Sequence, residues 1–196
     1  MPEKTATRQI ILEAVVTCIE KYGIDKLTTR KIAKEAGTNI ASINYYFRSK
    51  DELLAETLSM TINHMMEDVF AAIDDAQQRF DEVLTNVLFY LLDGTRKFPG
   101  ISRAHLYRAV IQNDRESISA QAMIRVFDRL VKRAEREYPG TDPKRLRLAL
   151  SQIMSSIMFA LLAGDFFPLP REYQLTSAKN TRALAEAYAR EFHCMR

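Results

Sequence analysis

Apolar residues recur at helical spacing along almost the whole chain, and no stretch shows the strict alternation of an exposed strand. In the first segment Ile11, Val15 and Ile19 share one face, and Gly23 follows where a left-handed residue commonly ends a helix. The pattern indicates an all-α fold. It predicts helices over 5–22, 28–36, 40–47, 49–73, 79–97, 101–112, 116–138, 142–164 and 176–192.

Several helix ends carry their own signals. Ser49 can accept a first-turn backbone N–H while the Glu52 carboxylate reaches back, which is a capping box. Asp142 precedes Pro143, and proline is favoured at the first position of a helix. The Pro99-Gly100 pair is expected to end one helix and to separate it from the next.

The predicted helix over 142–164 contains the longest uncharged stretch of the chain, the 17 residues from 148 to 164. A helix that spans a bilayer needs roughly 20 apolar residues, and this stretch includes several serines and a glutamine. We therefore expect a buried helix and no membrane partner. Because its apolar arc is wide, the helix needs burial on two sides.

The N-terminal residues and the cysteines indicate a cytoplasmic protein. The charges at the N-terminus are followed by no apolar run, so we expect no signal peptide. Cys18 and Cys194 stand near opposite ends of the chain, which is too few cysteines for a disulfide framework and the wrong spacing for a zinc finger.

The net charge of +3 is unevenly distributed. Residues 1–50 hold nine Lys and Arg against five Asp and Glu, a net of +4, whereas residues 51–196 hold 19 against 20, a net of −1. A positive field at one end suits a polyanion such as nucleic acid, but surplus charge also serves ordinary solubility.

Enzyme signatures that can be recognised in a sequence mostly need glycine or histidine at fixed spacing. The six glycines never lie closer than six residues apart, which excludes a phosphate loop, a dinucleotide fingerprint and a nucleophile elbow. His64, His105 and His193 are scattered, so surface or structural roles are favoured over a metal site. We predict no catalytic residue, no metal ligand and no cofactor.

The segment Thr28 to Phe47, TTRKIAKEAGTNIASINYYF, has the pattern of a helix-turn-helix. Its two short helices flank a turn that contains Gly37, and apolar residues on both helices can hold them together. The second helix then exposes polar and aromatic residues without any acid: Asn39, Ala41, Ser42, Asn44, Tyr45 and Tyr46. The alternative is a packed helical hairpin with polar edges.

These residue types match the chemistry of DNA reading. Asparagine can pair with adenine through two hydrogen bonds, small residues allow close approach to base edges, and hydroxyl groups donate to phosphates. Thr28 and Thr29 can present backbone N–H groups to a phosphate at the start of the first short helix. The flanking cations could add positive charge: Arg30, Lys31, Arg48 and Lys50.

The first 55 or so residues resemble the DNA-binding domain of TetR-type transcriptional regulators. The resemblance lies in the helix end at Tyr22-Gly23, in LTTRKIAKEAG, and in TNIASINYYFRSKDELL leading into a long helix. It implies about nine helices, with a three-helix DNA-binding head, residues 1–48, and a larger ligand-binding and dimerisation body, residues 49–196. It also implies a repressor on a double-stranded, palindromic operator, released by a small-molecule effector.

By position, the resemblance implies two groups of DNA contacts. The base-facing residues would be Asn39, Ile40, Ala41, Asn44 and Tyr45, and the phosphate contacts Thr28, Thr29, Ser42, Tyr46 and Lys50. The sequence departs from the family at three of these positions, where the family often has glycine for Ala41, tyrosine for Asn44 and histidine for Tyr46. These departures bear on which operator sequence is read.

The body supplies candidates for an interface and a ligand pocket. Helices 142–164 and 176–192 could form a four-helix bundle with their symmetry mates in a homodimer. Methionines and aromatic residues are suited to an apolar effector pocket, although an ordinary core explains them equally well. The ligand candidates are Met66, Phe89, Tyr107, Met123, Phe127 and Met158.

Two further interpretations concern the body. Arg103, His105 and Arg108 could meet an anionic group of a ligand, but a solvated face is favoured. The alternative to a DNA-binding regulator is a helical small-molecule-binding protein or enzyme without specific DNA binding, in which the basic N-terminal region is merely solvated.

Overall fold

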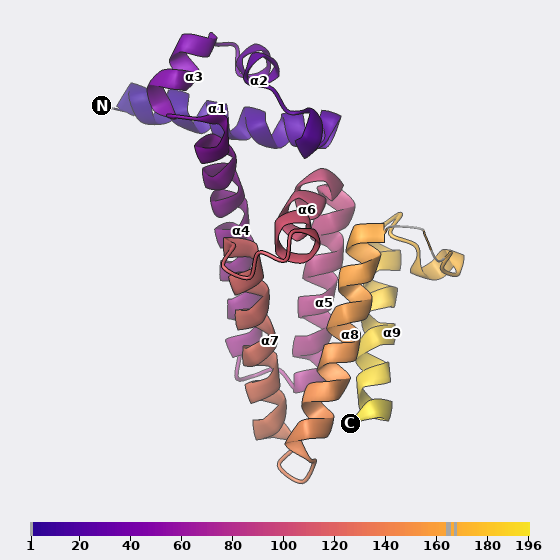
Figure 1. Ribbon diagram of the computed structural model, residues 1–196. Coiled ribbons are helices and arrows are strands. Elements are labelled where there is room, and N and C mark those ends of the chain that lie inside the picture. The colour runs from indigo at the N-terminus through magenta and orange to yellow at the C-terminus, as the bar shows by residue number, and fades with distance from the viewer. Residues whose placement is uncertain (1, 164–165, 167) are drawn as a thin grey trace.

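The computed structural model describes residues 2–163, 166 and 168–196. Within these ranges the chain forms nine α-helices and no strand, which confirms the predicted all-α fold. Figure 1 shows α1, α2 and α3 grouped at one end, with the remaining helices bundled below them and the long α4 running between the two groups.

The head is built from α1 (Pro2–Tyr22), α2 (Thr29–Glu35) and α3 (Ile40–Tyr46), with a short 3-10 turn, Ile24–Lys26, after α1. Gly23 follows α1 with a φ of 78°, as the sequence predicts. The buried residues of these helices form one apolar cluster with residues of α4 and α6: Ile11, Leu12, Ala14, Val15, Cys18, Ile19, Leu27, Ile32, Ala33, Ile43, Phe47, Leu53, Leu58, Ile101 and Ala104.

The long helix α4 (Lys50–Asp74) begins after a cap that the sequence predicts in part. The Ser49 hydroxyl accepts the Glu52 backbone N–H at 3.0 Å, as expected. The Glu52 carboxylate reaches back to the Arg48 N–H at 2.9 Å, one residue before the predicted Ser49 donor. Ser49 itself has the extended backbone of an N-cap residue, with φ −151° and ψ 163°.

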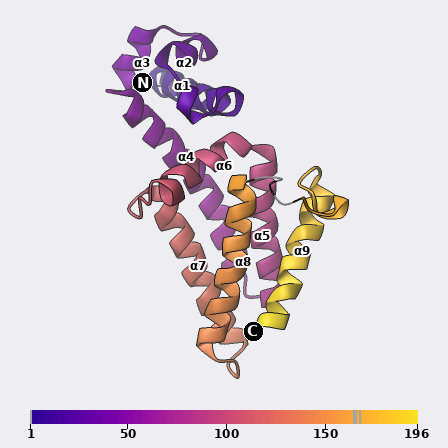
Figure 2. The ribbon, with the colours of Figure 1, turned by 45° about the vertical axis from the view of Figure 1, so that its right-hand side comes forward.

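The body packs α4 with α5 (Phe80–Lys97), α7 (Ile118–Glu137), α8 (Pro143–Ala163) and α9 (Ala178–Met195). Helix α5 lies against α9, α4 lies against α7, and α8 contacts both α7 and α9. Figure 2 shows this bundle turned by 45°, with α4 and α7 on the side away from α9. A second apolar cluster fills its centre and is separate from the head cluster.

Helix α6 (Pro99–Leu106) and the π-helical turn Tyr107–Ile111 replace the single helix predicted over 101–112. Pro99 is the first residue of α6, so the Pro-Gly pair opens a helix as well as ending the preceding one. The Gln112 N–H donates to the Tyr107 carbonyl at 3.0 Å, a bond from residue i+5 to residue i that widens the turn. Apolar periodicity alone does not distinguish this turn from a regular one.

Helix α8 begins at Pro143, and Asp142 Oδ1 accepts the Lys144 N–H at 3.0 Å, in agreement with the predicted start. By length and composition alone its stretch Pro143–Leu162 could cross a membrane, and one third of that stretch is buried. Leu148 is 60% exposed and Phe159 is 45% exposed. Within the single chain, α8 is therefore buried on one side only, whereas the sequence predicts burial on two sides.

Candidate nucleic-acid interface

The turn between α2 and α3 is fixed by backbone hydrogen bonds at the end of α2. The Thr38 N–H donates to the Ala33 carbonyl at 2.9 Å, and the Gly37 N–H donates to the Lys34 carbonyl at 3.4 Å. This pair of bonds requires a left-handed residue at Gly37, whose φ is 63°. Glycine adopts that conformation without strain, so the local sequence sets the angle at which α3 leaves α2.

Helix α3 is anchored by one face and exposed on the other. Ile43 and Phe47 are 2% and 1% exposed and lie in the head cluster. Ala41, Asn44 and Tyr45 lie on the exposed side of the same helix. No acidic residue occurs in α3, so this exposed face would meet a polyanion without charge repulsion.

Asn39 has a structural function at the start of α3. Its Oδ1 accepts the Ser42 backbone N–H at 2.8 Å, which is the hydrogen bond of a helix N-cap. A bidentate contact to adenine uses the amide oxygen as well as the nitrogen, so in such a contact the Asn39 oxygen would accept from adenine and from the Ser42 N–H together. In the described part of the chain Asn44 caps no helix, and its side chain is exposed.

Two tyrosines, Tyr45 and Tyr46, form the C-terminal end of α3. Tyr45 is 67% exposed, and its ring meets that of Tyr46 edge to face, with the ring centroids 5.1 Å apart. Tyr46 is half-buried and packs against the head cluster. Ile40 is 42% exposed at the first position of α3. The edge-to-face contact favours this orientation of the Tyr45 ring.

The predicted phosphate contacts gather around the start of α2. Thr28 caps α2 by accepting the Lys31 N–H at 3.3 Å, and Thr29 and Arg30 follow in its first turn. Lys50 is distant in sequence, yet its Nζ donates to the Leu27 carbonyl at 3.3 Å. The fold therefore brings Lys50 next to Thr28.

Lys31 is engaged elsewhere on the head. Its Nζ donates to the Lys26 carbonyl at 2.8 Å and lies 4.5 Å from the centroid of the Tyr22 ring. Arg48 is exposed immediately before the Ser49 cap of α4. Of the flanking cations, Arg30 and Arg48 thus stand at the surface, whereas Lys31 is tied to the turn that follows α1.

A contact that the sequence did not suggest joins the head to the body. The Glu20 carboxylate of α1 accepts the backbone N–H groups of Gly100 and Ile101 at 3.0 and 2.7 Å, and so caps α6. A Cβ atom at Gly100 would lie 2.9 Å from the Ile19 carbonyl oxygen, which only glycine avoids. No local signal could reveal this link, because its partners lie 80 residues apart.

The other end of α6 is tied to the body through His105. Its Nε2 lies 2.9 Å from the Thr61 hydroxyl of α4, and its Nδ1 lies 2.8 Å from the Ser119 hydroxyl of α7. Burial lowers the pKa of His105 to about 4, so the ring is neutral near pH 7. The favoured expectation of a solvated His105 is therefore wrong, because α6 directs the ring between two neighbouring helices.

The six predicted ligand residues are spread over α4, α5, the π-helical turn, α7 and α8. Phe89 lies under the Arg182 guanidinium of α9, 4.3 Å from its ring centroid, whereas Phe127 lies under Arg147 of α8 at 5.1 Å. Met66 is buried in the body core, and Tyr107 is 38% exposed on the π-helical turn. Met123 and Met158 are half-buried. The ligand assignment stays a prediction.

Residues 11–57 match the model of the family described as bacterial regulatory proteins, tetR family. This range takes in most of α1, all of α2 and α3, and the first turns of α4. The head of this chain thus belongs to the tetR family. Among the described residues, no group of three or more His, Cys, Asp or Glu side chains is placed to hold a metal ion.

The chain is also similar to two curated proteins and to a solved structure. It is 27% identical to the nucleoid occlusion factor SlmA of Haemophilus influenzae over 127 residues, 63% of this chain and 56% of SlmA. It is 36% identical to the transcriptional regulator BetI of Yersinia pestis over 62 residues, 32% of this chain and 31% of BetI. The chain thus spans about half the length of the SlmA relative and about a third of BetI.

The third is a solved structure, the regulator FadR of Bacillus subtilis in complex with stearoyl-CoA. It superposes with a TM-score of 0.67 at 15% identity, covering 94% of this chain and 96% of FadR. The match extends through head and body alike, so the chain shares its overall fold with this structure.

Proposed function

We propose that the protein is a dimeric, non-enzymatic transcriptional repressor of the cytoplasm, which binds a palindromic operator and is released by a small-molecule effector. The observation that carries the proposal is the acid-free exposed face of α3, which is anchored by Ile43 and Phe47 in a head of the tetR family. We place the domain boundary between residues 48 and 49, where α3 has ended and the cap of α4 begins.

In this proposal α3 enters the major groove. Ala41, Asn44 and Tyr45 face the bases, with Ile40 and Asn39 at the leading end of the helix, since these are the residues of α3 that the head core leaves outside. The phosphates are contacted from both sides of the helix. Those contacts are assigned to Thr28, Thr29, Arg30, Ser42, Tyr46 and Lys50.

The dimer is proposed to form through α8 and α9. Leu148 and Phe159 expose apolar surface on α8, which is costly in a single chain and favourable in an interface. Between α8 and α9 lies an open cleft of about 530 Å³, whose lining mixes polar and apolar residues and includes Ser151, Tyr188 and Glu191. To read a palindromic operator, the two heads of such a dimer would have to reach half-sites about 34–36 Å apart, one turn of DNA.

The signal from the effector is proposed to travel through α6. Glu20 ties the first turn of α6 to the head, and His105 ties its last turn to α4 and α7. A ligand that moved α4 and α7 relative to each other would therefore displace α6 and with it α1. Operator affinity would fall by the difference in the ligand's affinity for the two arrangements.

The effector is proposed to bind among the apolar side chains of the body. Met66, Phe89, Met123, Phe127 and Met158, together with Tyr107, remain its candidate contacts. A long-chain acyl-CoA is a rational first compound to assay, because the similar FadR fold holds stearoyl-CoA.

A fluorescence-anisotropy titration tests the proposal. The parent protein is titrated against labelled DNA from its own upstream region and against a scrambled duplex, at two salt concentrations. We expect tight, salt-sensitive binding to the upstream DNA alone, weakened for that sequence by Asn44→Ala and weakened on both duplexes by Lys50→Ala. If the parent and both variants bind every duplex equally, α3 does not read DNA and the proposal fails.

A further inference from the structure

A cleft of about 430 Å³ opens between the end of α4 and the second half of α7. Figure 1 shows this region at the end of the body opposite to α3. Four cations and one carboxylate line it, with one apolar residue: Arg129, Lys132, Arg133, Arg136, Asp74 and Ile73. We propose that this cleft binds a small anion that carries two or more phosphate groups.

The cations converge because of their spacing along α7. Positions 129, 132, 133 and 136 recur at intervals of three and four residues, which places them on one face of a helix. The acidic residues Asp128 and Glu135 fall outside this arc. Helix α7 thus presents a stripe of positive charge toward the end of α4.

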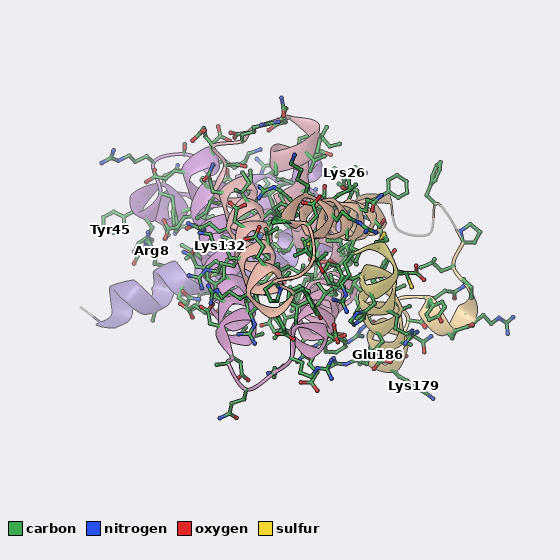
Figure 3. All side chains as sticks on the ribbon, turned by 90° about the horizontal axis from the view of Figure 1, so that it is seen from below. Arg8, Lys26, Tyr45, Lys132, Lys179 and Glu186 are labelled. Atoms are coloured by element: carbon green, nitrogen blue, oxygen red, sulfur yellow. The ribbon has the colours of Figure 1, made fainter. Side chains whose placement is uncertain are left out.

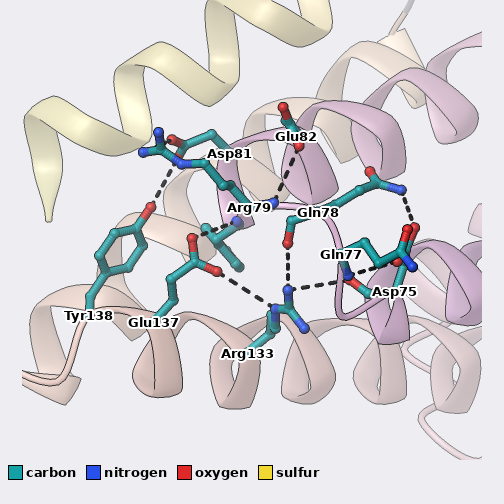
Figure 4. Close-up of polar contacts among 10 residues, drawn as sticks. Asp75, Gln77, Gln78, Arg79, Asp81, Glu82, Arg133, Glu137 and Tyr138 are labelled. Carbon is teal, nitrogen blue, oxygen red and sulfur yellow. Dashed lines mark hydrogen bonds and ion pairs between the residues drawn. The ribbon is translucent and has the colours of Figure 1, made fainter.

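Arg133 is a fixed part of the cleft. Its guanidinium donates to the Gln78 carbonyl at 2.6 Å and to the Asp75 carbonyl at 3.3 Å, and it lies 3.8 Å from the Glu137 carboxylate (Figure 4). These bonds hold α7 against the connection between α4 and α5. The positive charge of Arg133 is therefore held in place before any ligand arrives.

The other acidic side chains near this connection accept hydrogen bonds from residues outside the cleft. Asp75 accepts the Gln77 N–H and the Gln78 amide, and these bonds lower the pKa of its carboxyl group. Glu137 accepts the Phe80 N–H at 2.8 Å in addition to facing Arg133. Asp74 alone lines the cleft as a carboxylate.

Arg129 offers a second ordered cation. It pairs with Asp74, and its guanidinium lies 4.0 Å from the centroid of the Phe70 ring. The Asp74 side chain is 63% exposed, so this pair is held weakly and an incoming phosphate can replace the carboxylate. Guanidinium groups match phosphate through two parallel hydrogen bonds, which favours this exchange.

Lys132 and Arg136 supply the remaining charge. Both are exposed, and neither has a hydrogen-bond or ion-pair partner within the described ranges 2–163, 166 and 168–196. Of the four cations in the cleft, Arg129 pairs with Asp74 and Arg133 faces Glu137, so two positive charges remain and a monoanion would compensate only one of them. A ligand with several phosphate oxygens can engage Arg129, Lys132 and Arg136 together, and this selects polyphosphate over sulfate.

The test measures binding of inorganic pyrophosphate to the full chain by isothermal titration calorimetry, without DNA and at constant ionic strength. The double variant Lys132→Gln, Arg136→Gln removes two charges from the cleft. Lys179→Gln removes one exposed charge from α9, away from α7, as the labels in Figure 3 indicate. Because all the substitutions lie at exposed positions, equal melting temperatures of the three proteins serve as the folding control.

We expect the parent to bind pyrophosphate more tightly than sulfate, the double variant to bind about tenfold more weakly, and Lys179→Gln to match the parent. The proposal is overturned if the parent shows no binding at about 1 mM pyrophosphate. Equal losses in the double variant and in Lys179→Gln, or equal binding of sulfate and pyrophosphate, would also overturn it. The assay contains no DNA, so its outcome is independent of the proposed operator binding.

Discussion

The head and the body differ in how their function is encoded. The head presents its chemistry on the exposed face of the seven-residue helix α3, whose other face is held in the core by Ile43 and the following Phe47. The body depends on contacts such as Glu20 with Gly100 or Thr61 with His105, whose partners are far apart in sequence. Local patterns therefore carry the function of the head, whereas the function of the body depends on the folded chain.

The first prediction separates the two cores. Phe47→Ala should cost about 3–5 kcal/mol of unfolding free energy, because a large, fully buried ring is removed from the small head cluster. Operator binding should be lost while the body stays folded. Denaturation followed by circular dichroism, alongside the anisotropy assay, measures both effects.

Leu88→Ala provides the matched change in the body, where the side chain is equally buried. It should destabilise the body by about 2–5 kcal/mol. If both variants shift one common transition by the same amount, head and body unfold as a single unit and the contrast between them is refuted.

The second prediction concerns the proposed dimer. Leu148→Glu should weaken dimerisation by about 2–4 kcal/mol, since two copies would bring like charges into an apolar interface. Analytical ultracentrifugation measures the effect. Ile124→Glu on α7 is the control, because Ile124 is 45% exposed on a helix outside the proposed interface. A dimer that survives Leu148→Glu unchanged would exclude α8 from the interface.

The third prediction uses the buried histidine of the body. The pKa of His105 is about 4 in the folded chain against an ordinary 6.5, so the unfolded chain takes up the proton first as the pH falls. The stability that the neutral ring contributes is complete above pH 6.5 and is lost as the pH falls toward 4. Between these values the parent should lose about 2–3 kcal/mol more than His105→Gln.

Urea denaturation of both proteins at several pH values measures this difference. Carboxyl groups titrate alike in the two proteins, so subtraction isolates the imidazole. Parallel curves for the parent and the variant across this interval would show that His105 is solvated in solution.

The fourth prediction addresses the link between head and body. Glu20→Ala should cost about 0.5–2 kcal/mol, the usual loss on removing a helix N-cap. It should leave operator affinity nearly unchanged and reduce the response to effector. Glu13→Ala removes the same charge from α1, where the carboxylate accepts a hydrogen bond from Gln9 and the Thr17 hydroxyl donates to the Glu13 backbone carbonyl. An identical effector response in both variants would contradict the proposed route through α6.

The elements that local chemistry determines could be predicted from the sequence. The caps at Ser49 and Asp142 and the helix ends at Gly23 and Gly37 each depend on residues within one turn, and the structure contains them all. The exposed face of α3 follows from the same local spacing. Its assignment to base and phosphate contacts rests on DNA chemistry and remains a prediction.

Long-range packing explains what the sequence did not reveal. The π-helical turn at Tyr107–Ile111 has the same apolar spacing as a regular helix, so periodicity gives no sign of it. The burial of His105 depends on α4 and α7, and the cap from Glu20 depends on Gly100, distant in the chain. A ligand pocket likewise requires side chains from several helices, which apolar patterning does not place together.

Selection of binding sites from random duplexes tests the central claim most directly, with the parent protein and with Asn44→Ala. We predict that the parent enriches an inverted repeat whose half-sites are centred about one helical turn apart, and that Asn44→Ala relaxes the preference at one position of each half-site. Selection of no common sequence by the parent, or of an unchanged sequence by the variant, would contradict the claim that α3 reads the operator.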